Sequence, residues 1–278
     1  MTNILELKNF SKSYPGFSIK DVSFTLPKGY ICGFVGQNGA GKTTILKSIL
    51  GFTRPDSGTI ELACCAEEIG VVMEAPMYVD EWTVAEVEMN LSPFYPAWDC
   101  VAFARYLEQF ALDRKKKIKA LSRGMKMKIQ LAVALSHGAK LLILDEPTSG
   151  LDPLARDEVC DLLREFVLDE SRSVLFSSHI TSDLEKTADY INFLIDGTIV
   201  YAGTKDALLE KYVRVAGGLG ALSAEQKRCI IGYREHGTGF EGMCERAHLR
   251  ILPQTLLAEA IALDDIFICM NKGAKLHE

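Results

Sequence analysis

The sequence predicts an α/β fold with a largely parallel core sheet. Short apolar runs at residues 30–35, 69–73 and 141–144 have the length and composition of buried strands. Segments of helical periodicity separate these runs, and strands that alternate with helices are typical of a parallel sheet. A length of 278 residues suits one large domain, or one domain with a small appendage.

The other elements follow in order along the chain. Residues 4–35 are predicted to be β structure, because apolar side chains alternate there, as at Ile19 and Val22. The last of these strands ends at Gly36, and a helix follows shortly after it. The remaining predicted elements are a helix at 42–50, a turn at 55–58, a block of helices at 83–136, a helix at 153–168 and a strand at 173–176.

The C-terminal part is predicted to form a small region of its own. Asp196 and Gly197 lie between two apolar runs and predict a tight hairpin. The glycine-rich stretch at residues 217–220 predicts a linker or a turn. We therefore expect a main domain over residues 1–212 and a small α/β appendage over residues 213–278.

Composition and charge exclude several classes of protein. A net charge of −6 has the wrong sign for non-specific binding to nucleic acid, so no nucleic-acid partner is expected. No stretch reaches the roughly 18 apolar residues of a membrane span, and residues 1–10 lack the apolar core of a signal peptide. Eight cysteines without CxxC spacing favour reduced thiols over a metal site. The chain is expected to be soluble and intracellular.

Residues 36–43 match the phosphate-binding pattern G-x-x-x-x-G-K-[ST]. The match follows a predicted strand and opens a predicted helix, which is the context that the pattern requires. Glycines let the backbone wrap phosphate groups, and the helix N-terminus adds partial positive charge. Lys42 is expected to reach the β- and γ-phosphates of a nucleotide, and the Thr43 hydroxyl to ligate Mg²⁺. The plainer alternative is a glycine-rich surface turn.

Two adjacent carboxylates follow the buried run at 141–144. Asp145 and Glu146 would lie at the carboxyl end of a core strand, where ligands of α/β proteins bind. Neighbouring residues of a strand point to opposite sides, so the two are expected to have different roles. Asp145 is expected to bind Mg²⁺ through water, and Glu146 to orient or deprotonate the attacking water. The alternative is an exposed acidic turn before Pro147.

Further motifs resemble those of ABC-type ATPases and occur in that family's order. Residues 121–125 (Leu-Ser-Arg-Gly-Met) are similar to the signature sequence, and residues 149–152 (Ser-Gly-Leu-Asp) to the D-loop. His179, at a predicted strand end, resembles the switch histidine, and Tyr14 resembles the aromatic residue that stacks on adenine. The resemblance covers about residues 3–210. The segments at 94–99 and 176–180 look similar to bacterial ATPases that drive exporter-type permeases.

This resemblance implies the ATP-binding subunit of a bacterial exporter-type ABC transporter. The implied fold is a P-loop NTPase of ABC type, with an antiparallel β subdomain and a helical subdomain inserted at about residues 75–135. The implied activity is hydrolysis of ATP with Mg²⁺, which powers transport through a separate permease. The subunit would be cytoplasmic and peripheral on the inner face of the cell membrane. The implied ATP contacts are Tyr14, Gly36, Gln37, Asn38, Gly39, Ala40, Gly41, Lys42, Thr43 and Thr44.

The resemblance also implies a head-to-tail dimer, with a second copy or with a paralogous ATPase. Ser122, Gly124 and Asp152 would then contact the ATP that the partner holds. Arg123 and Met125 depart from the family's usual glycine and glutamine, but they leave Ser122 and Gly124 in place. The plainer alternative for Ser122 and Asp152 is helix capping, since each precedes a helical segment.

Three further assignments have plainer alternatives. His179 is expected to sense the γ-phosphate and to act in catalysis with Lys42 and Glu146, or else to be an ordinary surface histidine. Glu74 stands where most relatives have a glutamine, and it is expected to be a conditional Mg²⁺ ligand or else a solvent-facing residue. Tyr14 is expected to stack on adenine, or else to be a turn residue beside Pro15 and Gly16.

Two other functions stay open from the sequence. One is a soluble ABC ATPase of DNA repair or cluster assembly, against which the lack of zinc-type cysteines and of a basic surface argues. The other is a regulatory ABC protein with a degenerate site, against which the intact motifs argue. Side chains such as Tyr78, Val79 and Trp82 belong either to the hydrophobic core or to a docking surface for the permease.

Overall fold

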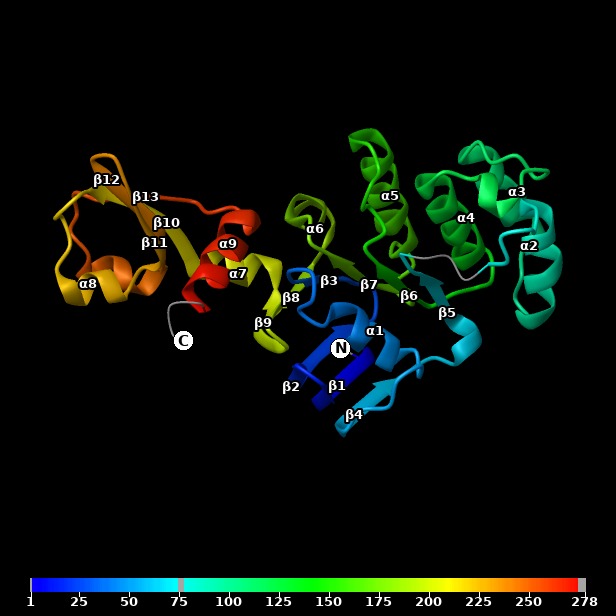
Figure 1. Cartoon of the computed structure of the whole chain (residues 1–278), viewed down its shortest axis with the longest axis horizontal. Coiled ribbons are helices and arrows are strands. Elements are labelled where there is room, and N and C mark those ends of the chain that lie inside the picture. Colours follow the sequence, from blue (N-terminus) through cyan, green and yellow to red (C-terminus); the bar gives the residue numbers. More distant parts are fainter. Residues whose placement is uncertain (1, 75–77, 275–278) are drawn as a thin grey trace. The chain divides into compact units, whose positions relative to one another are not determined.

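The computed structural model of the chain describes residues 2–74 and 78–274. The chain forms two compact units, Met1–Val200 and Tyr201–Glu278 (Figure 1). The split lies twelve residues before the domain boundary expected from the sequence, and strand β9 (Thr198–Thr204) runs across it. The boundary at 212/213, as a limit of the functional domain, stays a prediction.

The first unit is built on a six-stranded sheet in the order β5-β6-β7-β3-β8-β9. The first five strands in that order are parallel to one another, which confirms the predicted core. The tight hairpin is also present, with positive φ at both Asp196 and Gly197. The core strands are β3 (Ile31–Val35), β5 (Ile69–Val72), β6 (Leu141–Asp145), β7 (Ser173–Ser178) and β8 (Tyr190–Ile195).

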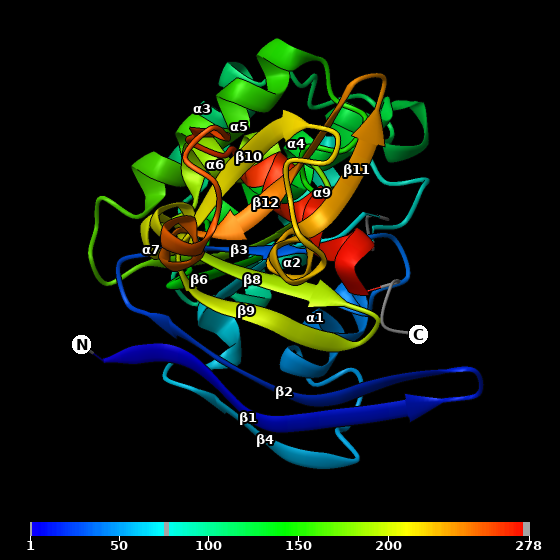
Figure 2. The same cartoon turned by 90° about the vertical axis from the view of Figure 1, so that its left-hand side faces the viewer.

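A second, antiparallel sheet forms a separate layer of the first unit (Figure 2). Its strands β1 (Asn3–Tyr14), β2 (Phe17–Pro27) and β4 (Ser57–Leu62) are arranged in the order β2-β1-β4. Helix α1 (Lys42–Ile49) lies between the two sheets, because its Ile45 shares one buried cluster with Phe10 of β1 and Leu141 of β6. The apolar side chains of α1 are thus buried against both sheets, and this burial holds in place the helix that begins at the phosphate-binding pattern.

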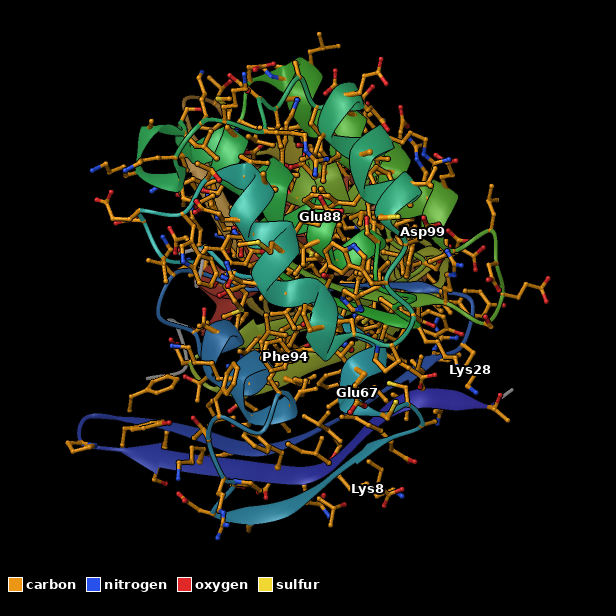
Figure 3. All side chains as sticks on the ribbon, turned by 90° about the vertical axis from the view of Figure 1, so that its right-hand side faces the viewer. Lys8, Lys28, Glu67, Glu88, Phe94 and Asp99 are labelled. Atoms are coloured by element: carbon orange, nitrogen blue, oxygen red, sulfur yellow. The ribbon has the colours of Figure 1, made fainter. Side chains whose placement is uncertain are left out.

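Three helices form the predicted helical block: α2 (Val84–Leu91), α3 (Cys100–Gln109) and α4 (Arg123–Leu135). Side chains cap all three N-termini, since Thr83, Asp99 and Ser122 each accept hydrogen bonds from backbone N–H groups of the first turn. Helix α4 packs against β5 at the edge of the core sheet. Figure 3 looks onto α2, with Glu88 and Phe94 labelled on this face. Residues 75–77 of the helical subdomain, expected at about residues 75–135, lie outside the described residues.

Two more helices, α5 (Pro153–Phe166) and α6 (Thr181–Thr187), cover the face of the core sheet opposite α1 (Figure 1). The two helices pack against each other, and Leu184 of α6 lies so close to Gly33 of β3 that a Cβ at residue 33 would be 2.9 Å from it. Helix α5 follows directly after the D-loop, and Asp152 caps it with Pro153 in the first turn. The strand–helix alternation predicted between residues 141 and 176 is confirmed.

The second unit contains a four-stranded sheet in the order β11-β12-β10-β13. Val215 and Phe240 belong to its own small core. The linker or turn predicted at 217–220 is present as a turn at residues 219–220 only, because Gly217 and Gly218 end strand β10. Its elements are α7 (Lys205–Lys211), β10 (Tyr212–Gly218), α8 (Ala224–Arg228), β11 (Ile231–His236), β12 (Gly239–Glu245), β13 (Leu257–Glu259) and α9 (Leu263–Ala274).

Candidate nucleotide site

The loop at residues 36–41 joins β3 to α1, as the phosphate-binding pattern requires. Gly41 stands at the N-cap position of α1 with φ +109, a conformation that disfavours side chains. A Cβ on Gly41 would also lie 3.0 Å from the side chains of Phe17 and Ile19 on β2. The glycine is therefore required both by the backbone turn and by the close approach of the antiparallel sheet.

Lys42 points into the loop that it follows. Its side chain is only 5% exposed, and its ammonium donates to the backbone oxygens of Gly36 at 2.6 Å and Gln37 at 3.3 Å. The same nitrogen lies 3.1 Å from Glu146 Oε1. The buried cation is thus balanced by the carboxylate of Glu146, which is 11% exposed, as burial of a charge requires. A phosphate group that binds Lys42 has to compete with these three protein oxygens.

Asp145 ends β6 beside the start of α1 and is almost fully buried. Its Oδ2 accepts a hydrogen bond of 2.7 Å from the Thr43 hydroxyl, and its Oδ1 accepts one of 2.6 Å from Ser177. Ser177 is the residue paired with Asp145 on the neighbouring strand β7. The sequence analysis missed Ser177, although its place at the end of a strand next to the motif histidine was a usable signal.

Glu146 lies just after β6, where it has φ +52. The expected alternation of Asp145 and Glu146 along a strand is therefore wrong, since the chain turns out of the sheet at Glu146. Its backbone N–H donates to the backbone oxygen and to the hydroxyl of Ser177, at 3.1 Å each. Its Oε2 lies 2.6 Å from Nδ1 of His179 and accepts from the backbone N–H of that residue at 3.3 Å. Glu146 thus bridges Lys42 and His179.

A cleft of about 330 Å³ opens beside these residues. Tyr14 is not among the residues that line it; Tyr14 is 42% exposed, with the Lys12 ammonium 5.7 Å from its ring centre. The aromatic ring in the lining belongs to Phe17, which pairs with Tyr14 across the hairpin and which the sequence analysis missed. The stacking of Tyr14 on adenine stays a prediction. The lining residues are Phe17, Gln37, Asn38, Gly39, Gly41, Lys42, Thr43, Thr44, Glu74 and Glu146.

The D-loop aspartate and the signature serine both cap helices. Ser122 Oγ accepts from the backbone N–H of Met125 at 3.3 Å, and Asp152 Oδ1 accepts from Ala155 at 3.0 Å. The Ala155 hydrogen bond holds the pKa of Asp152 below its usual value. Both residues therefore cap helices, and a contact of either one with the nucleotide of a partner stays a prediction. Both are also exposed, so capping leaves them accessible to another molecule.

The signature glycine is closely packed. A Cβ on Gly124 would be 2.9 Å from the Leu151 side chain, which belongs to the D-loop. The preceding residue, Arg123, reaches Glu74 at 2.8 Å and Ser149 at 3.3 Å. The signature helix, the D-loop and the end of β5 therefore meet beside the cleft.

Comparison with known proteins agrees with this arrangement. Residues 19–149 match the family model described as ABC transporter. The chain is 32% identical over 222 residues to the ABC transporter ATP-binding protein YtrB of Bacillus subtilis (strain 168), with 76% of each chain covered. The chain belongs to the family of ABC transporter ATP-binding proteins.

Other relatives and a solved structure extend the comparison. The lantibiotic transport ATP-binding protein SrtF of Streptococcus pyogenes is 33% identical, over 71% of this chain and 89% of the relative. The bacitracin transport ATP-binding protein BcrA of Bacillus licheniformis is 31% identical, over 72% of this chain and 69% of the relative. A solved ATP-binding subunit of an ABC transporter has a TM-score of 0.67 at 28% identity, over 74% of this chain and 91% of that chain.

Membership of the family fixes the general activity. This ABC protein binds nucleotide and is an ATPase subunit of a transporter. Among residues 2–74 and 78–274, no helix is long and apolar enough to cross a membrane.

Proposed function

We propose that this ABC subunit hydrolyses Mg²⁺-bound ATP in the cleft, with Glu146 as the base for the attacking water. The observation that supports this most is the contact of one carboxylate with both other catalytic candidates. Glu146 lies 3.1 Å from the Lys42 ammonium and 2.6 Å from His179 Nδ1. A general base must be held in a fixed orientation, and two contacts on two different oxygens do that.

The residues around Thr43 fit a magnesium ion. Thr43 and Asp145 present a hydroxyl and a carboxylate 2.7 Å apart, and Mg²⁺ prefers such oxygen ligands. Bound there, Mg²⁺ would neutralise charge on the phosphates. Glu74, which lines the same cleft, is assigned as a conditional third protein ligand. Glu74→Gln should keep most hydrolysis but weaken the Mg²⁺ dependence of ATP binding, whereas Glu74→Ala should impair coupling to the permease more than nucleotide binding.

The protein's own residues account for the other steps. The backbone N–H groups of residues 36–43 and the N-terminus of α1 bind the phosphates, and Lys42 leaves its backbone acceptors for phosphate oxygens. Glu146 takes a proton from the attacking water, and His179 holds Oε2 of that carboxylate in place. Lys42→Ala should abolish ATP binding and hydrolysis, while Lys47→Ala, at the opposite end of α1, should change neither. Nucleotide affinity and phosphate release measure the two effects.

The proposed active form is a head-to-tail dimer with a second copy or a paralogous ATPase. Ser122, Gly124 and Asp152 would contact the nucleotide of the partner. The exposure of Ser122 and Asp152 supports this, as does the exposed N-terminus of α4, whose partial charge favours a phosphate. Size-exclusion chromatography with and without ATP tests it, and a chain that stays monomeric with ATP in a hydrolysis-deficient variant would refute the dimer.

A separate transmembrane permease is the proposed partner, which would hold this subunit on the inner face of the cell membrane. The relatives named as lantibiotic and bacitracin transport proteins support it. The helical block offers a pocket of about 240 Å³ whose lining includes Tyr78, Trp82 and Tyr95, and Phe94 beside it is 74% exposed (Figure 3). An apolar permease segment fits this lining better than a charged one.

The partner is tested by copurification from membranes. Phe94→Ser should reduce recovery of a multi-helix membrane protein, whereas Leu168→Ser, which changes an equally exposed apolar side chain elsewhere, should not. Full ATPase activity with no membrane protein bound to the wild type would favour a soluble ABC ATPase. Loss of the membrane protein in both variants would refute this docking surface.

A further inference from the structure

Arg123 joins three segments that surround the nucleotide cleft. It is the first residue of α4, and one of its guanidinium nitrogens lies 2.8 Å from Glu74 Oε1 and 3.3 Å from Ser149 Oγ. Glu74 follows β5, and Ser149 belongs to the D-loop. The next residue, Gly150, has φ +76, and a Cβ there would be 3.4 Å from the Arg123 side chain. Arg123 therefore packs along the D-loop on its way to Glu74.

The three carboxylates near the cleft, those of Asp145, Glu146 and Glu74, contact different kinds of partner. Asp145 accepts hydrogen bonds from two hydroxyl groups, and Glu146 pairs with Lys42, a residue of the phosphate loop. Glu74 pairs with Arg123, which lies in the helical block and not in the phosphate loop. Among these three carboxylates of the described structure, Glu74 is the one whose charge is balanced from the helical block.

We propose that Arg123 is a positioning residue for Glu74. The Arg123 guanidinium holds the Glu74 carboxylate at the edge of the cleft and competes with Mg²⁺ for that carboxylate. The inference rests on the proposed function, because it requires Mg²⁺ and nucleotide in the cleft. Mg²⁺ demands ligands at about 2.0–2.1 Å in near-octahedral geometry. Glu74 Oε1 is the oxygen that Arg123 holds, so the metal has to take it from a guanidinium that also repels a cation.

The competition is weak enough to be reversible. The side chains of Arg123 and Glu74 are 53% and 63% exposed, and ion pairs of that exposure are screened by water. Loss of the Arg123–Glu74 ion pair should change the Mg²⁺ concentration needed for nucleotide binding by a factor of about 2–5, on the scale measured for exposed pairs. The pair thus shifts the Mg²⁺ requirement and does not block the metal.

A purely structural role for Arg123 predicts something different. If the guanidinium only supports the D-loop through Ser149, its removal should act whatever residue stands at position 74. If it acts on Glu74, its removal should have no effect on the metal once the carboxylate is absent. The two roles are therefore separated by a double-mutant cycle, in which coupling between the two positions is measured directly.

The experiment measures the affinity of a fluorescent ATP analogue as Mg²⁺ is titrated from zero. It uses the full chain as wild type, Arg123→Ala, Glu74→Gln and the double variant. Lys128→Ala is the matched control, because Lys128 lies on the same helix and pairs with Glu158 at 3.1 Å, away from the cleft. Arg123→Lys keeps the charge without the planar group, and it should restore part of the wild-type behaviour. Circular dichroism establishes that each variant is folded.

Arg123→Ala should lower the Mg²⁺ concentration at half-effect about 2–5-fold, and the shift should vanish in the Glu74→Gln background. Lys128→Ala should behave as wild type. A shift of equal size in both backgrounds, or no shift in either, would overturn the positioning role while ATP binding stays intact. A wild type whose nucleotide binding ignores Mg²⁺ would refute the metal assignment of the proposed function, and this inference with it.

Discussion

Replacing Glu146 by Gln removes the proposed base while keeping the size of the side chain. Oε1 of Glu146 lies 3.1 Å from the Lys42 ammonium, and its Oε2 lies 2.6 Å from His179 Nδ1 and accepts from the His179 backbone N–H at 3.3 Å. The amide keeps one of these oxygens and loses the negative charge and the ability to accept a proton. Loss of a positioned general base lowers turnover by a factor of about 10² or more. That factor corresponds to about 2.7 kcal/mol added to the activation barrier.

ATP affinity should stay the same or rise while turnover falls, because Lys42 loses the carboxylate that competes with phosphate for its ammonium. The Glu146→Gln variant should therefore bind ATP at least as tightly as the wild type and accumulate as an ATP-bound dimer. Single-turnover phosphate release, nucleotide affinity and size-exclusion chromatography with ATP and Mg²⁺ measure the three quantities. Glu158→Gln, an exposed residue of α5 paired with Lys128, is the matched control and should change none of them.

Near wild-type hydrolysis in Glu146→Gln, together with a chain that is monomeric in ATP, would refute the role given to Glu146. Reduced hydrolysis with equally reduced ATP binding would point to a damaged cleft and not to a missing base. The control variant excludes a general effect of replacing one acidic residue in this chain.

Three other outcomes are expected. Ser122→Arg should abolish hydrolysis with little loss of ATP affinity in the monomer. A mixture of the Ser122→Arg chain with the Lys42→Ala chain should recover about one working site per mixed dimer, and a mixture without activity would contradict the head-to-tail arrangement. Burial lowers the pKa of His137 below 6.5, so the free energy of unfolding should fall as the pH drops below about 6.5. Urea unfolding at several pH values should show that His137→Gln loses this part of the pH dependence. Gly197→Ala places a Cβ 2.0 Å from a backbone oxygen, whereas Gly51 has the same φ of +76 with open space around it. Gly197→Ala should therefore lower the free energy of unfolding clearly more than Gly51→Ala, and equal losses would mean that backbone strain alone decides.

Local patterns were sufficient for much of the fold and for the centre of the site. The phosphate loop was predictable because strand, glycines and helix are contiguous, and Asp145 was predictable because it ends an apolar run. Contacts between distant segments were not predictable in this way. Ser177 reaches Asp145 through strand pairing, and Arg123 reaches Glu74 across 49 residues of sequence.

The errors have equally local causes. Glu146 was expected to continue the strand, but its φ of +52 turns it out of the sheet toward Lys42, and sequence alternation does not reveal such a turn. Gly217 was interpreted as part of a linker or a turn, although a glycine inside a strand also allows close packing. A Cβ there would lie 2.4 Å from the Leu256 side chain, so the residue serves the packing of the second unit.

The contact of Gly41 with the antiparallel sheet has a consequence for ligand-linked stability. The turn of the phosphate loop rests on Phe17 and Ile19 of β2, and Ile19 is fully buried in the cluster that also holds α1. Any ligand that binds only the correctly shaped loop therefore also stabilises the sheet beneath it, by an amount that grows with ligand concentration. Substitutions at Ile19, which is buried beneath the loop and does not line the cleft, can consequently tune nucleotide affinity without touching the nucleotide.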